Sequence, residues 1–143
     1  MTRFRALLEG WARGDLHPAP VADLVGFRLV SCAEGEARIE LDAGPRHHNP
    51  MGIVHGGILC DLADAAMGVA LAAALDEGET FATLQLSASY LRSVRDGRLT
   101  ATGRLVHRGK SVAHAEAEVT DGESRTVARF TSTCLVSRPA PPR

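Results

Sequence analysis

The stretch HNPMGIVHGGILCDLADAAMG, residues 48–68, combines a glycine-rich loop with an alanine- and leucine-rich helical pattern. The apolar spacing predicts a helix from about Gly57 to about Leu75. A helix this apolar belongs in a core, yet it carries Asp61 and Asp64. Because an unpaired charge in a core is costly, we expect Asp64, which stands between two alanines, to have a partner or a chemical task.

The predicted helix begins at the sequence His55-Gly56-Gly57. The first N–H groups of a helix have no intrahelical acceptors and carry the positive end of its dipole. A glycine there lets the carbonyl of another molecule approach the backbone, and such donors suit a carbonyl that becomes an oxyanion. A second interpretation stays open, in which the two glycines only permit a tight turn into the helix.

The spacing within this stretch restricts how its residues can act together. Asp64 lies nine residues after His55, which is roughly 13 Å along a helix and about half a turn out of phase. The two cannot meet at one small substrate within a single subunit. If Gly56 holds a carbonyl on which Asp64 acts, they come from different chains, so the sequence predicts a symmetric homodimer with two shared sites.

On both sides of the helix the pattern alternates between apolar and polar residues, which is typical of strands. Turn signals stand at Glu34-Gly35, Asp96-Gly97 and Asp121-Gly122, and we interpret Asp96-Gly97 as a hairpin turn before a strand starting at about Arg98. A sheet with one apolar face must cover it, and the central helix is the only element apolar enough. The prediction is an α+β fold in which an antiparallel sheet wraps around one long central helix.

The chain is the size of one domain, and we expect a single domain over residues 1–143. Its N-terminal part, residues 1–19, is predicted to be a helical extension because Thr2–Trp11 shows helical spacing. The proline-rich end, residues 138–143, is expected to be a disordered tail.

Composition excludes several classes of function. A formal net charge of -1 gives no general attraction to nucleic acid or acidic membranes. The three cysteines, Cys32, Cys60 and Cys134, are odd in number and form no C-x-x-C pair, which indicates free thiols in a reducing compartment. The longest apolar stretch, residues 65–75, is too short to span a bilayer, and no signal peptide is apparent. We therefore expect a cytoplasmic protein without nucleic-acid or membrane partners.

Residues 49–64 match the pattern N-x-x-G-x-x-H-G-G-x-x-x-x-L-x-D. This signature resembles that of hotdog-fold acyl-CoA thioesterases of the phenylacetate-degradation type, and the resemblance extends from about Pro20 to Val136. It implies the hotdog fold and hydrolysis of an aryl- or medium-chain acyl-CoA to free acid and CoA. It also implies a homodimer, assembled further into a tetramer, and no cofactor, because coenzyme A is part of the substrate.

The resemblance also assigns roles to residues of the signature. Asp64 would be the catalytic carboxylate, as a general base on water or as a nucleophile. The backbone N–H of Gly56 would polarise the thioester carbonyl. Asn49 and His55 would orient the water or the thioester from the opposite subunit.

Coenzyme A phosphates would lie near the later basic loop, at Arg108, Lys110 and Ser111. Arg92 is a weaker candidate for the same role, because Ser93 follows it where members of the family often carry proline.

Asp61 occupies a position that is usually small or apolar in the family. It either perturbs Asp64 by repulsion between like charges or faces solvent at the start of the helix. We favour the second interpretation.

Other chemistries fit less well. His47, His48 and His55 cluster in one loop, but they lack the tight ligand spacing of zinc hydrolases, so we expect no metal. Cys60 has hydrophobic neighbours and is interpreted as core packing.

Two alternatives share the predicted fold. One is a hydratase or dehydratase, whose motif is not found here, and the other is a sensing module that binds acyl-CoA without hydrolysing it. An acyl pocket has five apolar candidates, each of which also suits plain core packing: Met51, Ile53, Leu59, Met67 and Phe81.

Overall fold

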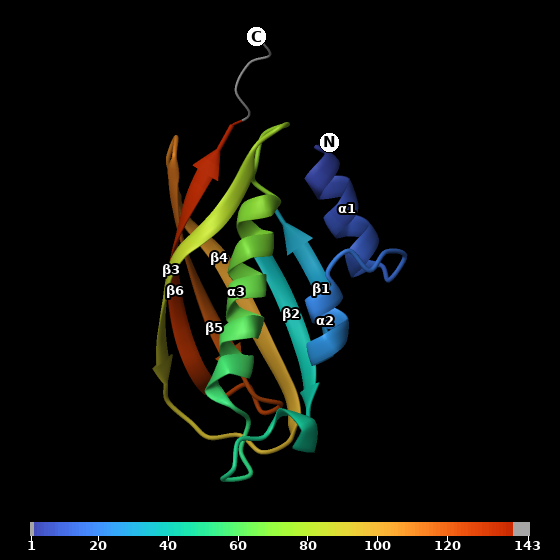
Figure 1. The fold of residues 1–143 in the computed structure, drawn as a ribbon, viewed down its shortest axis with the longest axis vertical. Coiled ribbons are helices and arrows are strands. Elements are labelled where there is room, and N and C mark those ends of the chain that lie inside the picture. The colour runs from blue at the N-terminus through green and yellow to red at the C-terminus, as the bar shows by residue number, and fades with distance from the viewer. Residues whose placement is uncertain (1, 139–143) are drawn as a thin grey trace.

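A six-stranded antiparallel sheet curls around helix α3 (Gly56–Ala72) (Figure 1). The structure is a computed structural model that describes residues 2–138. The strands lie in the order β1-β2-β4-β5-β6-β3. Their bounds are β1 (Phe27–Ala33), β2 (Glu36–Ala43), β3 (Thr80–Tyr90), β4 (Gly97–Arg108), β5 (Val112–Thr120) and β6 (Thr126–Ser137). The predicted architecture, a sheet wrapped around one long helix, is confirmed.

One face of helix α3 is fully buried against the sheet. Leu62, Ala66 and Met67 are at most 1% exposed. On β4, a Cβ added to Gly103 would lie 2.4 Å from the backbone of Ala66, so this glycine lets the helix and the strand come into close contact. The alanine-rich pattern of the helix is therefore a packing requirement of the sheet.

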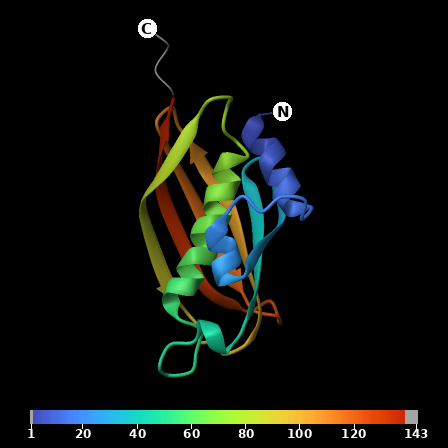
Figure 2. The same cartoon turned by 45° about the vertical axis from the view of Figure 1, so that its right-hand side comes forward.

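Two shorter helices lie on the same side of the sheet as α3 (Figure 2). Helix α1 (Arg3–Ala12) agrees with the predicted helical spacing, and the Thr2 hydroxyl caps it by accepting the Arg5 N–H at 3.2 Å. Helix α2 (Pro20–Val25) was not predicted. It starts at a proline and ends at Gly26, whose φ is +95°, but six residues are too few for periodicity to identify it.

The Asp96-Gly97 prediction was wrong. Strand β3 is an edge strand that pairs only with β6, whereas β4 lies between β2 and β5. Residues 91–96 therefore run from the edge strand β3 past β6 and β5 to β4, instead of forming a hairpin. Gly97 does adopt a positive φ, +107°, but this local requirement does not specify which strands pair. Glu34-Gly35 and Asp121-Gly122, by contrast, do join paired neighbours.

The remaining expectations concern the ends and the thiols. Arg138 is within the described residues, while residues 139–143 of the predicted tail lie outside them. Within residues 2–138 no helix is long and apolar enough to cross a membrane. Cys32, Cys60 and Cys134 are free thiols.

A 3-10 turn, η1 (Pro45–His47), leads from β2 into the glycine-rich loop before α3.

Candidate active site

The N-terminal end of α3 is capped by its own loop. Nδ1 of His55 accepts the Gly57 N–H at 2.9 Å, and the His55 N–H donates to the His47 carbonyl at 2.8 Å. The Gly56 N–H occupies the first position of the helix, where there is no intrahelical acceptor. The predicted backbone donor is therefore present at the end of the helix.

Tyr90, at the end of β3, explains why residue 56 is a glycine. Its hydroxyl donates to the Gly56 carbonyl at 3.0 Å, and a Cβ on Gly56 would lie 2.9 Å from that hydroxyl oxygen. Gly56 does not have a positive φ, so the turn itself does not require a glycine, whereas the close approach of Tyr90 does. Sequence reasoning missed Tyr90 because nothing local links it to a residue 34 positions away.

The Tyr90 hydroxyl also lies 3.2 Å from Sγ of Cys60. This hydrogen bond, followed by burial, raises the pKa of Tyr90 to about 12. The phenol therefore stays protonated and keeps its proton for the Gly56 carbonyl. Cys60 is half-buried and packs against the core as predicted, and in addition it forms this polar contact.

A cavity of about 360 Å³ opens beside this end of the helix, and Asn49, Gly56, Tyr90 and Arg92 are among its lining residues. The side-chain oxygen of Asn49 accepts the N–H groups of Met51 and Ile53, at 2.9 and 3.4 Å. That oxygen therefore organises the loop before the helix. The structure thus brings three predicted site residues together, Asn49, Gly56 and Arg92. His55 is exposed and lines a separate pocket with Asp61.

Asp64 lines a second cavity, which does not include Gly56. Its Oδ1 accepts a hydrogen bond from the Thr83 hydroxyl on β3 at 3.0 Å. The carboxylate is half-buried, and within residues 2–138 no arginine, lysine or histidine lies at ion-pair distance from it. Asp61 is exposed, as we favoured, and burial followed by the charge of Asp64 raises its pKa.

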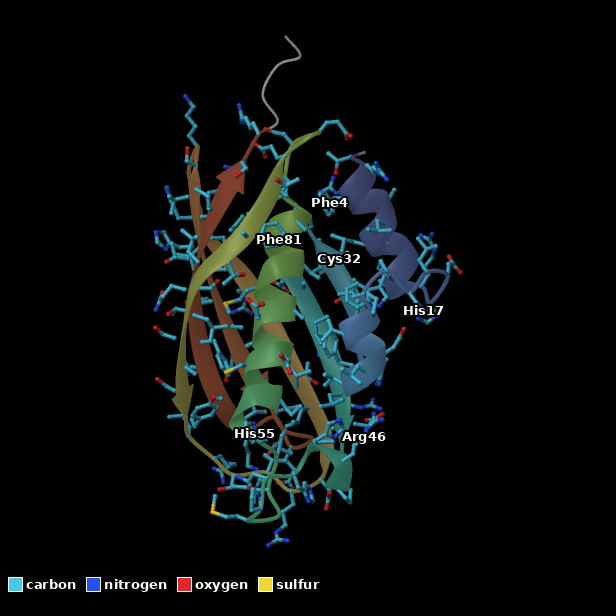
Figure 3. The ribbon with its side chains drawn as sticks, in the orientation of Figure 1. Phe4, His17, Cys32, Arg46, His55 and Phe81 are labelled. Atoms are coloured by element: carbon cyan, nitrogen blue, oxygen red, sulfur yellow. The ribbon has the colours of Figure 1, made fainter. Side chains whose placement is uncertain are left out.

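The cavity that Asp64 borders has a volume of about 470 Å³ and lies between α1, α3 and β3. Figure 3 shows Phe4 and Phe81 beside the C-terminal half of α3, with His55 at the opposite end of the helix. The lining residues are Phe4, Leu7, Leu8, Trp11, Pro18, Ala19, Val21, Phe27, Asp61, Asp64, Ala65, Gly68, Val69, Ala72, Phe81 and Thr83. The sequence could not indicate that α1 would cover Asp64.

Of the five apolar residues considered for an acyl pocket, only Phe81 lines the cavity beside Asp64. Ile53 and Leu59 line the cavity beside Gly56. Met67 is 1% exposed in the core, and Met51 is 72% exposed at the surface.

The predicted phosphate-binding residues lie in two places. Arg92 lies at the N-terminal end of α3, beside Gly56. Arg108 contacts Glu79, which follows the C-terminal end of the same helix. A helix of 17 residues is about 25 Å long, so one protomer does not gather these arginines at one point.

Arg108 already has an ion-pair partner. Its Nη2 lies 2.5 Å from Oε2 of Glu79, a carboxylate that is only 2% exposed, and Nε of Arg138 lies 2.8 Å from Oε1. The hydrogen bond from Arg108, followed by one from the Asp76 N–H, lowers the pKa of Glu79 to about 2. Lys110 and Ser111 are exposed in the turn that follows, and Lys110 has no ion pair within residues 2–138.

The loop that contains His47 and His48 is organised by hydrogen bonds between these side chains and the backbone. Nε2 of His47 lies 2.7 Å from the Val25 carbonyl, and its Nδ1 accepts the Gly44 N–H at 3.1 Å. Nε2 of His48 lies 2.8 Å from the Arg95 carbonyl. In the described part of the chain, no group of three or more histidine, cysteine, aspartate or glutamate side chains is placed to hold a metal ion.

Comparison with known sequences supports the resemblance. The model of the thioesterase superfamily matches residues 51–128. A 1,4-dihydroxy-2-naphthoyl-CoA hydrolase from Listeria monocytogenes is 32% identical over 99 residues, which cover 69% of this chain and 80% of the relative.

Comparison with solved structures leads to the same family. A phenylacetic acid degradation-related protein from Ralstonia eutropha JMP134 aligns with a TM-score of 0.81 and 28% identity, covering 90% of this chain and 98% of that protein. A conserved protein from Pseudomonas aeruginosa aligns with a TM-score of 0.79 and 31% identity, covering 83% and 94%. With its hotdog fold and its signature around Asp64, the chain belongs to the thioesterase superfamily and is a thioester hydrolase.

Proposed function

We propose that the protein hydrolyses the thioester bond of an aryl- or medium-chain acyl-CoA, releasing the free acid and CoA. The observation that carries this proposal is Asp64, a half-buried carboxylate with no cation in range within residues 2–138. The Thr83 hydroxyl orients it at the border of an apolar cavity. Such a carboxylate is available to deprotonate water or to attack a carbonyl carbon. The name of the Listeria relative supports a CoA thioester as substrate.

The proposed reaction needs both a carboxylate and an oxyanion donor. Within one protomer, Asp64 and Gly56 line different cavities and stand eight residues apart, about 12 Å along the helix. We therefore propose a homodimer in which Gly56 of one subunit and Asp64 of the other complete each site, with two dimers forming a tetramer. Strand β3 supports this, because it is an edge strand on which Leu84 is 61% exposed.

In the reaction, the Gly56 N–H donates to the thioester oxygen and stabilises the negative charge that develops there. The Asn49 amide and His55 orient the water or the thioester from the same subunit. Asp64 of the other subunit accepts a proton from water while the water oxygen bonds to the carbonyl carbon. The carbon–sulfur bond then breaks, and the proton passes to the departing sulfur. If Asp64 attacks directly, its oxygen bonds to the carbonyl carbon and the carbon–sulfur bond breaks, so that CoA leaves as a thiolate and a mixed anhydride remains. Water then cleaves the anhydride, which frees the acid and Asp64, and the proton that water releases neutralises the thiolate.

We propose that the phosphates of coenzyme A contact Lys110 and Ser111, with Arg108 behind them and Arg92 near the thioester end. Lys110 is the best placed of these residues, because its charge is exposed and has no ion-pair partner within residues 2–138. No step requires a cofactor. We further propose that the protein acts in the cytoplasm, in keeping with its free thiols.

A thiol-release assay across aryl- and alkyl-acyl-CoAs tests the reaction. We expect turnover by the wild type and a large loss in Asp64→Asn. Binding without hydrolysis of any thioester would favour the sensing module, and hydration of an enoyl-CoA would favour the hydratase. Activity that survives removal of the Asp64 charge would contradict the proposed mechanism.

A further inference from the structure

We infer that Tyr90 is a positioning residue of the thioesterase reaction, because its hydroxyl fixes the first residue of α3, whose N–H donates to the oxyanion. The inference rests on the proposed function, since Gly56 is the oxyanion donor proposed there. Tyr90 acts through the Gly56 carbonyl, to which its hydroxyl donates at 3.0 Å. This role requires no contact between Tyr90 and the substrate.

Strand β3 makes two polar side-chain contacts with α3. The Thr83 hydroxyl donates to Asp64 at 3.0 Å, and the Tyr90 hydroxyl donates to the Gly56 carbonyl. In Figure 1, β3 ends at the same end of the molecule at which α3 begins. Side chains alternate between the two faces of a regular strand. Thr83 and Tyr90 are seven residues apart, so in a regular strand they would point to opposite faces and only one would reach the helix.

A β-bulge in β3 removes this conflict. The register of β3 against β6 shifts between Thr83 and Gln85, where two steps along β3 correspond to one step along β6. An extra residue of this kind re-aims the side chains that follow it, and bulges are common next to active sites. The bulge therefore brings Tyr90 onto the face of the sheet that already carries Thr83.

The ring and the hydroxyl of Tyr90 have further partners that hold them in place. Because the hydroxyl donates its only proton to the Gly56 carbonyl, the Cys60 thiol, 3.2 Å away, is the donor to the phenol oxygen. The Tyr90 ring meets the Phe130 ring of β6 edge-on, with centroids 6.3 Å apart and planes at 89°, an arrangement that aromatic pairs prefer. Tyr90 is thus fixed to the sheet by its ring and to α3 by its hydroxyl.

The Gly56 N–H lies between groups that are themselves anchored. Before it, the His55 N–H donates to the His47 carbonyl at 2.8 Å, and the His55 carbonyl accepts the Ile58 N–H at 3.0 Å. After it, the Gly56 carbonyl accepts the Tyr90 hydroxyl. Of these three bonds, the one from Tyr90 ties Gly56 to the sheet. Its loss would loosen the donor, and misplacing a reacting group by about 1 Å can cost about 10²-fold in rate.

The first test removes the hydroxyl and keeps the ring. In Tyr90→Phe we expect kcat to fall about tenfold, because the donor is no longer aimed at the developing oxyanion. We expect KM to change less than about twofold, since the lost interaction acts in the transition state. The matched control is Ser89→Ala, which removes the neighbouring exposed hydroxyl of β3, in a cavity formed by β3, β4, β5 and β6. It should leave kcat unchanged. An unchanged kcat in Tyr90→Phe would overturn the inference.

A double-mutant cycle separates positioning from direct contact with the substrate. In Gly56→Ala the donor is already displaced, so adding Tyr90→Phe should lower kcat by less than about a further twofold, against about tenfold in the wild type. A hydroxyl that touched the substrate itself would cost about tenfold in both backgrounds. That result would reject the positioning role.

A third readout does not depend on hydrolysis. In protein labelled with [1-13C]glycine, the carbonyl resonance of Gly56 is identified by its loss in Gly56→Ala. A carbonyl carbon resonates at higher frequency when its oxygen accepts a hydrogen bond. We therefore expect the Gly56 resonance to move to lower frequency in Tyr90→Phe and to stay in place in Ser89→Ala. A resonance that does not move in Tyr90→Phe would contradict the inference.

The outcomes separate the inference from the proposed function. If Gly56→Ala loses activity and Tyr90→Phe does not, the inference fails and the oxyanion donor stands. If Gly56→Ala keeps full activity, the proposed donor fails, and the role of Tyr90 fails with it even where the resonance moves. A loss of about tenfold in Tyr90→Phe, little further loss in the double mutant and a shifted resonance together support both.

Discussion

Asp64, in the middle of α3, accepts a hydrogen bond from the Thr83 hydroxyl at 3.0 Å and has no cation in range within residues 2–138. Glu79, just beyond the end of the same helix, is 2% exposed and holds Arg108 and Arg138 at 2.5 and 2.8 Å. Both are carboxylates beside one helix, but only Glu79 is neutralised by its surroundings. A buried charge with partners is structural, whereas a half-buried charge without them is available for chemistry.

The sharpest test of this comparison removes the charge of Asp64. Asp64→Asn keeps an oxygen that accepts the Thr83 hydroxyl, so we expect the fold to persist while kcat falls by roughly 10²–10⁴. Steady-state kinetics and a thermal melt measure the two effects. Asp61→Asn is the matched control on the same helix, and we expect it to cost less than about tenfold. The assignment of Asp64 fails if Asp61→Asn abolishes turnover while Asp64→Asn retains it.

A second prediction concerns the separation of Asp64 from Gly56. In Gly56→Ala the new Cβ meets the Tyr90 hydroxyl, which displaces the oxyanion donor, and we expect kcat to fall by about 10²–10³. Mixing Gly56→Ala and Asp64→Asn subunits by co-refolding should restore about a quarter of wild-type activity, because half of the dimers then contain one intact site. If the mixture shows only the sum of the two mutants' residual activities, each site lies within one subunit.

For Glu79 the expected loss is in stability. Glu79→Gln leaves Arg108 and Arg138 without their buried counter-charge, and we expect the free energy of unfolding to fall by about 3 kcal/mol at neutral pH. Urea denaturation measures this. Asp42→Asn, at an exposed carboxylate that also pairs with two arginines, is the control and should cost much less.

The same pair predicts a pH dependence. The pKa of Glu79 is lowered from 4.5 to about 2 in the folded state, so its stabilisation is fully present above pH 4.5 and is lost as the pH falls towards 2. Glu79→Gln should remove this part of the acid dependence. Parallel acid-denaturation curves for wild type and mutant would show that Glu79 is not the group responsible.

The smallest expected effect is at Lys110. This residue is exposed, whereas Arg108 is held in an ion pair with Glu79. Lys110→Glu should raise the KM for acyl-CoA about two- to fivefold with little change in kcat, because a phosphate contact acts equally on ground and transition states. The effect should weaken at high salt. Arg38→Glu, an exposed charge reversal on β2, is the control. Equal KM values for the two mutants at low salt would place Lys110 outside the substrate site.

The central helix was predictable because its signals are local. The apolar period of residues 56–72 predicts a buried helix, and the signature places Asp64 on it at a set distance from Gly56. The hydrogen bond from Tyr90 to the Gly56 carbonyl was not predictable. Neither was the ion pair of Arg108 with Glu79, which is 29 residues away. These contacts depend on which strands become neighbours.

The sequence by itself determined backbone geometry over short ranges: the helix that carries Asp64, its donor end at Gly56, and the positive φ of Gly97. Only the tertiary structure decided that Gly97 begins a strand far from β3, and that α1 covers the cavity beside Asp64. The physical reason is that helix periodicity and turn preferences arise from neighbouring residues. Strand order and helix packing, in contrast, are selected by burying the apolar surfaces of the whole chain together.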